Sequence, residues 1–247
     1  MKPQRNDFDT LTYIQKRQRF LDEREISLVQ DFDQEAFERA YTELLDEPGG
    51  AGVTAPPLNS DSVEIDPDNF FWIDVRVGGR RIAAQAMRRD TISVPLSRYL
   101  DRHYRRIYCS GDTNAIAGHA PIADVITGDI VYHGGLYITP DWRGGGLATN
   151  LAQLAIALAY LRWNPDYVWG YVSDAKIMRG YHVRIGYFHC QPFGTHYRKD
   201  PPGIPGDDWI VWMSREDLNC QMRGDPKHKQ SVEIPSWSQK VTADDDT

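Results

Sequence analysis

The sequence predicts a mixed α/β fold in which a central twisted β-sheet is flanked by helices. Strand-like and helix-like segments alternate along the 247 residues, and residues 129–173 have the strand–helix–strand form of a parallel crossover. Residues 70–89 form the clearest hairpin, because two β-prone runs flank Gly78-Gly79, which supplies the positive φ angles of a tight turn. A hairpin and a crossover together indicate a mixed sheet.

The chain before the hairpin supplies an extension, a strand and a helix. Residues 1–23 are polar and charged, so we expect a helical or flexible extension. The run "REISLVQ" at 24–30 predicts a short strand, and Asp33 is a candidate N-cap for the next helix. Residues 48–62 are rich in helix breakers and predict a loop. One face of the helix carries apolar side chains at helical spacing: Phe37, Ala40, Tyr41, Leu44 and Leu45.

After the hairpin, residues 93–127 form a less regular insertion in which "SVPLSRYLDRHYRRIY" could hold a helix. Residues 129–139 predict a strand, and Gly134 and Gly135 inside it indicate a bulge or a close backbone approach. The Ala- and Leu-rich run 147–162 predicts a helix that is apolar almost all round and therefore buried.

The last third of the chain continues the alternation. Residues 166–173 predict a strand, and residues 174–186 predict a helix that ends at Gly186 as its C-cap. Two further strands are expected at 187–193 and 208–214.

These elements are interpreted as a single domain. It covers residues 24–218 with its insertion at 93–127, and it follows the extension at 1–23. Residues 219–247 are expected to be a frayed C-terminal tail.

Composition and charge argue against several classes of protein. A formal net charge of -7 does not suit a general nucleic-acid or membrane-surface binder, and the basic runs 88–90 and 102–106 are interpreted as solvated faces. The three cysteines are widely spaced without a CxxC or Cys/His cluster, so neither a disulfide framework nor a metal site is expected. The start lacks an apolar signal core and the longest apolar run, 151–161, is too short for a bilayer, so we expect a cytoplasmic protein.

A run of three glycines immediately precedes the apolar helix. In "PDWRGGGLATNLAQLAIALAYL", Gly144, Gly145 and Gly146 stand at the helix N-terminus, where unsatisfied N–H groups and the helix dipole favour an anion. Glycines let an anion approach the backbone closely, and Arg143 adds a positive charge. The run therefore predicts a phosphate-binding loop, with a plain tight turn as the alternative.

The residues around the glycines limit which phosphate-bearing ligand fits. A P-loop requires Lys followed by Ser or Thr after its last glycine, but Leu-Ala follows here. A dinucleotide fingerprint would read Gly144-x-Gly146-x-x-Thr149, and the threonine at its third position weakens that match without excluding it. The pattern R-x-x-G-x-A, at Arg143, Gly146 and Ala148, is the better match.

This pattern resembles the coenzyme A pyrophosphate loop of the GNAT superfamily of acyl-CoA-dependent N-acyltransferases, which is Q/R-x-x-G-x-G/A. "GGLYITPDWRGGGLA" resembles the family's fourth strand and the loop after it, and "GYHVRIGYF" resembles the end of a later helix, where an aromatic residue precedes Gly-Phe. The motifs cover about residues 131–190, and the order of elements fits from about 24 to 215. The resemblance implies a GNAT-like fold in which two strands splay apart at the cofactor site.

The resemblance also implies acetyl-CoA or another acyl-CoA as co-substrate, without a metal. Pantetheine would insert between the splayed strands, and backbone amides near the glycines would hold the pyrophosphate. A bulge at Gly134-Gly135 would turn an N–H toward the thioester carbonyl and stabilise its oxyanion. The cofactor-binding residues that this implies are Leu136, Tyr137, Ile138, Thr139, Arg143, Gly144, Gly145, Gly146, Leu147, Ala148 and Thr149.

A tyrosine on the later helix is the acid that the resemblance implies for the leaving thiolate. The family's tyrosine lies four residues before the glycine, where this chain has His182, whereas Tyr181 lies five before. Successive helical residues point about 100° apart, so the two cannot point the same way. Tyr181 is preferred as the acid, with His182 or neither as the alternatives. Candidate general bases are His133, on the strand beside the expected thioester, and more weakly Asp74, with a water relay as the alternative.

These inferences favour an N-acyltransferase, most simply one that moves an acetyl group from acetyl-CoA to a primary amine in a ternary complex. Two alternatives stay open: transfer of a longer acyl group from CoA or a carrier protein, and a non-catalytic acyl-CoA-binding or regulatory module. The acceptor is expected to be a small-molecule or peptide amine, and the net negative charge favours a cationic one. Segments 48–62, 93–127 and 194–208 are expected to shape its site, and exposed strand edges suggest a homodimer.

Overall fold

The computed structural model describes residues 5–45, 56–58, 63–108, 115–200, 206 and 208–224. The strands are β1 (Ser27–Asp31), β2 (Phe70–Val77), β3 (Arg80–Ile92), β4 (Ile116–His119), β5 (Gly128–Ile138), β6 (Tyr167–Val172), β7 (His189–Gln191), β8 (Thr195–Tyr197) and β9 (Trp209–Ser214). The α-helices are α1 (Asp7–Asp22), α2 (Gln34–Leu45), α3 (Leu96–Tyr108), α4 (Leu147–Trp163), α5 (Asp174–Ile177), α6 (Tyr181–Ile185) and α7 (Arg215–Arg223). Short 3-10 helices are η1 (Pro56–Leu58), η2 (Pro121–Asp124) and η3 (Pro140–Trp142).

A mixed sheet forms the centre of the molecule, in the order β1-β2-β3-β5-β6-β9-β7. Among the described strands of this sheet, β5 and β6 pair in parallel and all other neighbours pair antiparallel. The hairpin β2–β3 turns at Gly78 and Gly79, which have φ of +55° and +83°. The mixed α/β fold class and the hairpin that the sequence predicts are confirmed.

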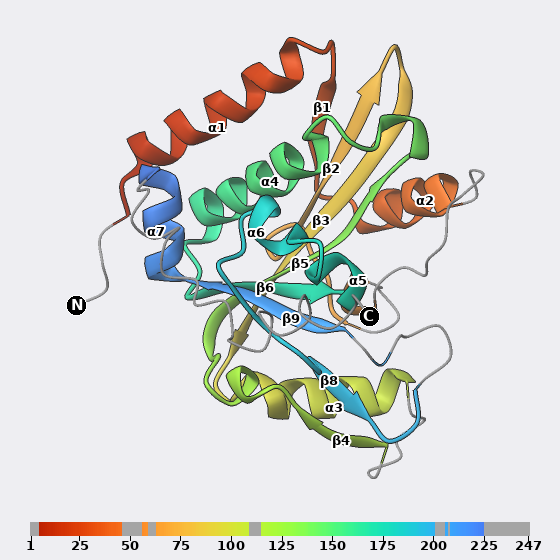
Figure 1. Cartoon of the computed structure of the whole chain (residues 1–247), viewed down its shortest axis with the longest axis vertical. Helices are drawn as coiled ribbons and strands as arrows, with labels where there is room; N and C mark the ends of the chain where they lie inside the picture. Colours follow the sequence, from red (N-terminus) through yellow and green to blue (C-terminus); the bar gives the residue numbers. More distant parts are fainter. Residues whose placement is uncertain are drawn as a thin grey trace, which may run out of the picture.

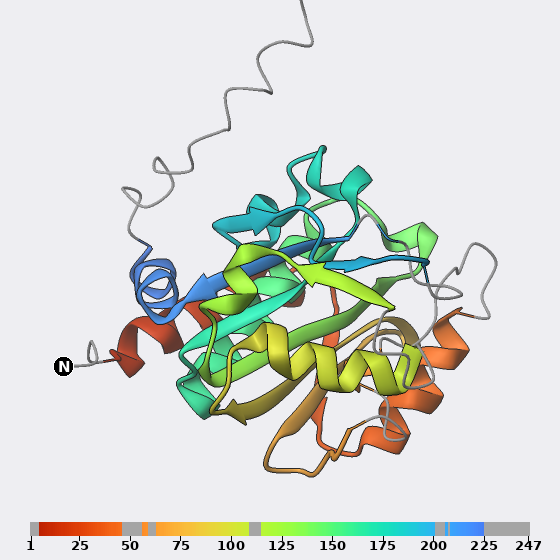
Figure 2. The ribbon, with the colours of Figure 1, turned by 90° about the horizontal axis from the view of Figure 1, so that it is seen from below.

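Helices cover both faces of the sheet (Figures 1 and 2). One face, called here the α4 face, packs Phe71, Ile73 and Val75 of β2 against a core that includes α1, α4 and α7. The opposite face, called the α3 face, packs Phe70 and Trp72 against α2, α3 and η1. The separate two-stranded sheet β4–β8 lies on this second side, below the main sheet in Figure 1. Because helices or strands cover both faces, the central strands are buried on each side.

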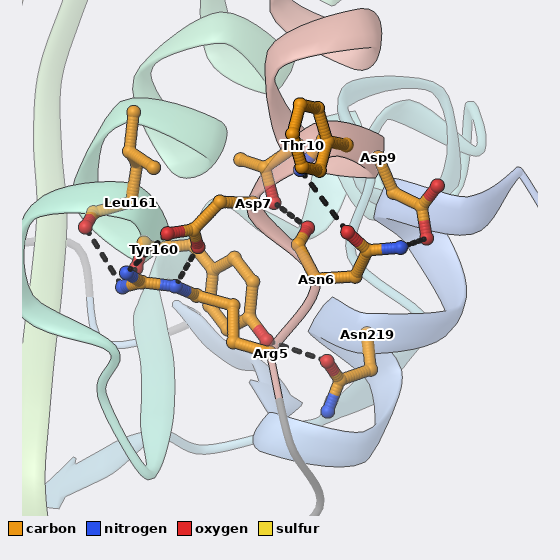
Figure 3. Close-up of polar contacts among 9 residues, drawn as sticks. Arg5, Asn6, Asp7, Asp9, Thr10, Tyr160, Leu161 and Asn219 are labelled. Carbon is orange, nitrogen blue, oxygen red and sulfur yellow. Dashed lines mark hydrogen bonds and ion pairs between the residues drawn. The ribbon is translucent and has the colours of Figure 1, made fainter.

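The apolar helix α4 is buried over most of its surface because it has two partners. The sheet lies beneath it, and α1 runs antiparallel along its outer side, so that Phe20 comes within 3.8 Å of a Cβ built on Gly146. Arg5, just before α1, donates from Nη1 to the carbonyls of Tyr160 and Leu161 at 3.1 and 2.8 Å (Figure 3). A guanidinium at the C-terminus of a helix adds donors to its last carbonyls and interacts favourably with the helix dipole; the carbonyl of Tyr160 also accepts from the backbone N–H of Asn164 at 3.0 Å. The extension is therefore a helix docked on the domain.

Three expectations about the chain are corrected. The helix expected at 174–186 is broken into α5 and α6, because Gly180 adopts a left-handed φ of +67° between them. The sequence after 218 does not fray at once, since α7 continues to Arg223 and begins with a capping box at Ser214 and Asp217. Strand β8, inside the loop expected at 194–208, was not predicted at all and pairs with β4.

The basic run 88–90 is also not a solvated face. Arg88 is 1% exposed, and it donates to Asp90 at 2.5 Å, to the carbonyl of Pro57 at 2.6 Å and to the hydroxyl of Tyr99 at 3.0 Å. Arg88 and Asp90 share one side of β3, two residues apart, and that side is the buried α3 face. The strand period therefore brings the charge pair inside.

Some expectations fall outside the described residues: most of 48–62, residues 109–114 of the insertion, and the tail beyond Gly224. Across the described ranges, none of the helices combines the length and the apolar composition needed to cross a bilayer.

Candidate active site

Strands β5 and β6 separate part of the way along their length. They pair from Ile130–Tyr167 to Tyr132–Trp169, after which β5 follows β3 and β6 follows β9. The last close approach is at Gly170, where an added Cβ would lie 2.7 Å from the carbonyl oxygen of His133. Beyond it, the described residues form no further β5–β6 pair. The strands therefore diverge at this point, as the resemblance implies.

The two glycines at this point of β5 are structurally required. The register against β3 slips between Ala84 and Ala86, which places one extra residue on β5. Gly135 has φ of +63°, and a Cβ there would lie 2.9 Å from the ring of Phe37. A Cβ on Gly134 would lie 2.5 Å from the ring of Tyr132. The bulge expected at Gly134-Gly135 is therefore present, beside the divergence of the strands.

The glycine loop adopts a backbone that side chains disfavour. Gly144, Gly145 and Gly146 have φ of +96°, +54° and +83°, and nothing lies within 4 Å of a Cβ built on the first two. The glycines are thus explained by their left-handed backbone rather than by crowding. The amides of Ala148 and Thr149, in the first turn of α4, have no acceptor within the helix. An exposed loop with such amides fits an anion such as a pyrophosphate.

Arg143 is tied to the end of β5. Its Nε donates to the carbonyl of Ile138 at 2.9 Å, and its guanidinium lies 5.4 Å from the ring centre of Tyr137. This leaves the two Nη groups as the part of Arg143 suited to a phosphate. Loop and strand end are therefore held together by the same side chain.

The expected pantetheine strand, residues 136–139, is only partly suited to that role. The backbone N–H of Thr139 donates to the carbonyl of Ile82 on β3 at 2.9 Å, so this amide is engaged on the other side of the strand. Tyr137 is buried, and its hydroxyl has no partner among the described residues. Leu136 is half-buried and Ile138 is buried.

The alternatives Tyr181 and His182 lie in different surroundings. Burial raises the pKa of Tyr181 to about 12, with a smaller opposing effect from Arg184. The Tyr181 ring packs against the α4-face core. His182 Nε2 lies 3.6 Å from the sulfur of Cys190, and its Nδ1 is buried without a partner among the described residues. Burial lowers the pKa of His182. Tyr181 is thus a protonated phenol at neutral pH, which suits a proton donor.

His133 is buried in a hydrogen-bonded chain on the α4 face. Its Nδ1 lies 3.0 Å from the hydroxyl of Tyr187, and its Nε2 lies 3.2 Å from Oε1 of Gln85, which itself donates to the carbonyl of Leu151. Burial lowers the pKa of His133 to about 4. With both ring nitrogens engaged and the ring neutral, His133 does not suit the role of general base.

Tyr187 has a hydroxyl whose contact with His133 the sequence analysis did not predict. Its position, directly after Gly186, is the phenylalanine position of the Gly-Phe motif, and the replacement adds a hydroxyl that bonds to His133. Burial raises the pKa of Tyr187, with further contributions from Tyr132 and Tyr181. The tyrosine in place of phenylalanine was the available signal.

Asp74, the weaker base candidate, is engaged in ion pairs with two arginines of the hairpin. It is buried and forms ion pairs with Arg76 and Arg81 at 2.8 and 2.7 Å. Its carboxylate therefore balances two guanidinium groups on the hairpin. Within the described residues, no cluster of three or more His, Cys, Asp or Glu side chains is arranged to hold a metal ion.

Comparisons with known proteins give distant structural matches. No protein-family model and no curated protein matches the sequence. A similar solved structure is the N-acyl amino acid synthase FeeM from uncultured soil microbes, at 8% identity and TM-score 0.46, covering 78% of this chain and 93% of that one. Mutant forms of the spermidine/spermine N-acetyltransferase SpeG from Vibrio cholerae share 8% identity at TM-score 0.46, covering 80% and 98%. Arabidopsis thaliana Naa50, in complex with the bisubstrate analogue CoA-Ac-MVNAL, shares 13% identity at TM-score 0.42, covering 77% and 99%.

At these identities and TM-scores the matches assign no chemistry to this chain. The chemistry of the site therefore has to come from its own residues.

Proposed function

We propose that this protein is an acyl-CoA-dependent N-acyltransferase, most simply one that transfers an acetyl group to a primary amine. The observation that carries the proposal is the exposed left-handed loop Gly144–Gly146, which joins the diverging end of β5 to the N-terminus of the buried helix α4. This arrangement offers free amides and a positive dipole end to a pyrophosphate. The neighbouring strand divergence offers backbone groups to an extended pantetheine.

In this proposal the main contribution to rate is the alignment of amine and thioester in one ternary complex. The bulge at Gly134-Gly135 directs a backbone N–H toward the thioester carbonyl, so that the oxyanion of the tetrahedral intermediate is stabilised. Arg143 and the amides of residues 144–146, 148 and 149 hold the pyrophosphate, since the amide of Leu147 already bonds to the carbonyl of Gly144 at 3.2 Å, and residues 136–138 accompany the pantetheine. Thr139 would act through its side chain, because its amide already bonds to Ile82.

Tyr181 is proposed as the acid that protonates the leaving thiolate. Two observations support it over His182: its phenol is protonated at neutral pH, and it lies near enough to Tyr187 to raise the pKa of that phenol. Tyr187 in turn contacts His133, whose carbonyl marks the point where the strands diverge. These contacts support the proposal that Tyr181 lies near the expected thioester end of the site.

Calorimetric titration with acetyl-CoA, palmitoyl-CoA, NADH and ATP is the first test. We expect binding of a CoA ester alone, and the preference between the two esters identifies the acyl length, including the long-chain alternative. Binding of NADH would instead support the dinucleotide reading of the loop, and no binding would leave the loop as a plain turn. Thiol release on addition of amines then separates an enzyme from a non-catalytic acyl-CoA-binding module.

Replacement of Tyr181 by Phe tests the acid. We expect kcat to fall about 100-fold, which is the lower range for loss of a general acid, with the affinity for the CoA ester unchanged. The matched control is His182→Gln, which should leave kcat within a few-fold. A larger loss in the histidine variant than in the tyrosine variant would assign the acid to His182.

The acceptor in this proposal is an amine on a small molecule or a peptide. A homodimer and a cytoplasmic location stay predictions. Light scattering of the purified protein would check the first, and localisation in cells would check the second.

A further inference from the structure

A series of hydrogen bonds joins α1, in the N-terminal extension, to α6, the helix that carries Tyr181. The hydroxyl of Tyr13 on α1 donates to Oε1 of Gln153 on α4 at 2.9 Å, and it accepts from Nε2 of Gln221 on α7 at 2.9 Å. Nε2 of Gln153 in turn donates to the backbone carbonyl of Arg184 on α6 at 3.1 Å. The series therefore links side chains of three helices to the backbone of α6 (Figure 1).

The directions of these bonds follow from the single hydrogen of the Tyr13 hydroxyl. The amide nitrogen of Gln221 can only donate, so the oxygen of Tyr13 accepts from it and the hydrogen of Tyr13 goes to Oε1 of Gln153. Because Tyr13 engages that oxygen, the amide nitrogen of Gln153 is directed at the carbonyl of Arg184. Tyr13 therefore sets the orientation of the Gln153 amide, and with it the bond to α6.

The side chains of this series are closely packed against the end of α6. Tyr13 and Gln221 are each 8% exposed. A Cβ added to Gly186, directly after α6, would lie 2.6 Å from Nε2 of Gln221 and 3.3 Å from Cγ of Gln153. The guanidinium of Arg17 lies 4.5 Å from the ring centre of Tyr13. The absence of a side chain at Gly186 therefore lets both glutamines reach the end of α6.

Helix α6 depends on such outside contacts for its orientation. It has five residues, and the left-handed glycines Gly180 and Gly186 separate it from the segments before and after it. A helix of this length is not stable by itself. Arg184, whose carbonyl accepts from Gln153, donates its own N–H to the carbonyl of Gly180 at 3.3 Å, directly before Tyr181. A displacement at Arg184 is therefore passed on to Tyr181.

We propose that Tyr13 is a positioning residue for Tyr181, an inference that rests on the proposed N-acyltransferase function. Tyr13 acts through the amide of Gln153 and the carbonyl of Arg184. Without the Tyr13 hydroxyl the Gln153 amide loses its fixed orientation, α6 gains freedom, and the phenol of Tyr181 is less often in line with the leaving sulfur. Small misplacements of a catalytic group are costly in rate. The N-terminal extension thus contributes to turnover as well as to stability.

The same helix reaches the proposed cofactor loop at a different point. Phe20 of α1 lies 3.8 Å from a Cβ built on Gly146. It follows Tyr13 by about two helical turns, so a substitution that keeps the Tyr13 ring leaves the contact of Phe20 with the loop in place. The position of the acid and the binding of the cofactor can therefore be changed separately.

A double-mutant cycle tests the proposal, with thiol release from acetyl-CoA and ethylamine as the acceptor. Tyr13→Phe removes the hydroxyl and keeps the ring. We expect it to lower kcat about 10-fold and to leave the affinity for acetyl-CoA unchanged. In a Tyr181→Phe background it should lower kcat no further, because the acid is already absent. A residue that only stabilises the fold would lower kcat by the same factor in both backgrounds.

Two further variants separate the contact with α6 from the loss of a buried hydroxyl. Gln153→Glu keeps an oxygen for Tyr13 but loses the amide hydrogens that reach Arg184, so it should lower kcat as Tyr13→Phe does. The matched control is Tyr160→Phe. The hydroxyl of Tyr160 also joins α4 to α7, through Oδ1 of Asn219, and within the described residues it makes no bond to α6. This variant should leave kcat within a few-fold of wild type.

Each step of the inference can fail separately. An equal loss of kcat on Tyr13→Phe in the two backgrounds, or a loss of the same size on Tyr160→Phe, would overturn the positioning role. An unchanged kcat in Tyr181→Phe would also overturn it, because there would be no acid at that position, and acetyl transfer itself would stand. Absence of thiol release by the wild-type protein, despite binding of acetyl-CoA, would overturn transfer to this amine and the inference with it.

Discussion

The proposed cofactor side of the candidate site and the α3 face are assembled from the chain in different ways. The loop, the bulge and the helix that would hold the cofactor all belong to one continuous stretch, from β5 to the end of α4. On the α3 face, a hydrogen-bonded set of side chains comes from α3, β4, β6 and β8, which span nearly a hundred residues of sequence: Asp101, His119, Tyr171 and Thr195. The first side is built mainly from backbone, and the second from side chains that meet only in the fold. A short motif can therefore describe the proposed cofactor side but not the α3 face.

The largest effect is expected on the cofactor side, where a charge reversal tests the backbone loop. Arg143→Glu combined with Gly146→Glu should abolish detectable binding of acetyl-CoA, because it places two carboxylates where the pyrophosphate is expected and strains the φ of +83° at residue 146. Calorimetry measures the affinity. Arg39→Glu, at an exposed position on α2, is the charge-matched control. Unchanged affinity in the double variant would contradict the proposed role of the loop.

A second variant tests the side-chain construction of the α3 face. Arg88→Met should lower the free energy of unfolding by about 3–5 kcal/mol, since it leaves Asp90 and the carbonyl of Pro57 without their buried partner. Urea unfolding measures the change. Arg80→Met, which breaks an exposed pair with Asp141, should have a much smaller effect. Similar losses in the two variants would show that burial of Arg88 contributes little.

A third test uses pH to probe the α4 face, where His133 is buried and neutral. Its pKa in the folded protein, about 4, lies below the value near 6.5 of an unfolded chain. The unfolded state therefore binds the proton first, so the contribution of His133 to stability is full above pH 6.5 and is lost as the pH falls toward 4. At pH 5 the loss should be about 2 kcal/mol.

The measurement is the pH dependence of urea unfolding for the wild-type protein and for His133→Gln. The variant should lack that part of the slope between pH 6.5 and 5, because it carries no titrating group at this position. Parallel curves for the two proteins would mean that His133 titrates normally in the fold.

The smallest expected effect concerns the attachment of α1 to the α4 face. Arg5→Ala removes the guanidinium that bonds to the carbonyls of Tyr160 and Leu161 (Figure 3), and we expect a loss of about 1 kcal/mol in the free energy of unfolding. Arg39→Ala, an exposed arginine on α2, serves as the control and should change little. An equal change in the free energy of unfolding of both variants would mean that Arg5 does not contribute to the docking of α1.

The sequence predicted those parts of the fold in which neighbours along the chain are also neighbours in space. The turn at Gly78-Gly79, the bulge at Gly134-Gly135 and the left-handed loop before α4 all follow from the conformational freedom of glycine at a local position. The strand of residues 195–197 could not be predicted in this way, because its partner β4 lies more than seventy residues earlier.

The charged and titratable residues were the least predictable. From the sequence, Arg88 is expected at the surface. In the fold it is buried, and its guanidinium bonds to Asp90, Tyr99 and the carbonyl of Pro57. An ordinary histidine has a pKa near neutrality, as a general base requires, and the sequence alone gives His133 no other value. Burial beside Tyr187 and Gln85 lowers the pKa of His133 out of that range. His119 carried no signal at all, since Asp101 and Thr195 reach it from distant segments. Burial and partners decide the chemistry of such residues, and both are properties of the fold.

The two left-handed glycines that bound α6 have a consequence for how a position counted along the sequence corresponds to a position in the fold. Gly180 and Gly186 separate five residues from the helix before and the strand after, so the direction of Tyr181 is set by the break and not by the turn of a longer helix. A tyrosine displaced by one position in an alignment is then not displaced by a fixed angle in space. In such a segment, counting residues back from Gly186 does not fix which side chain reaches a given point of the fold.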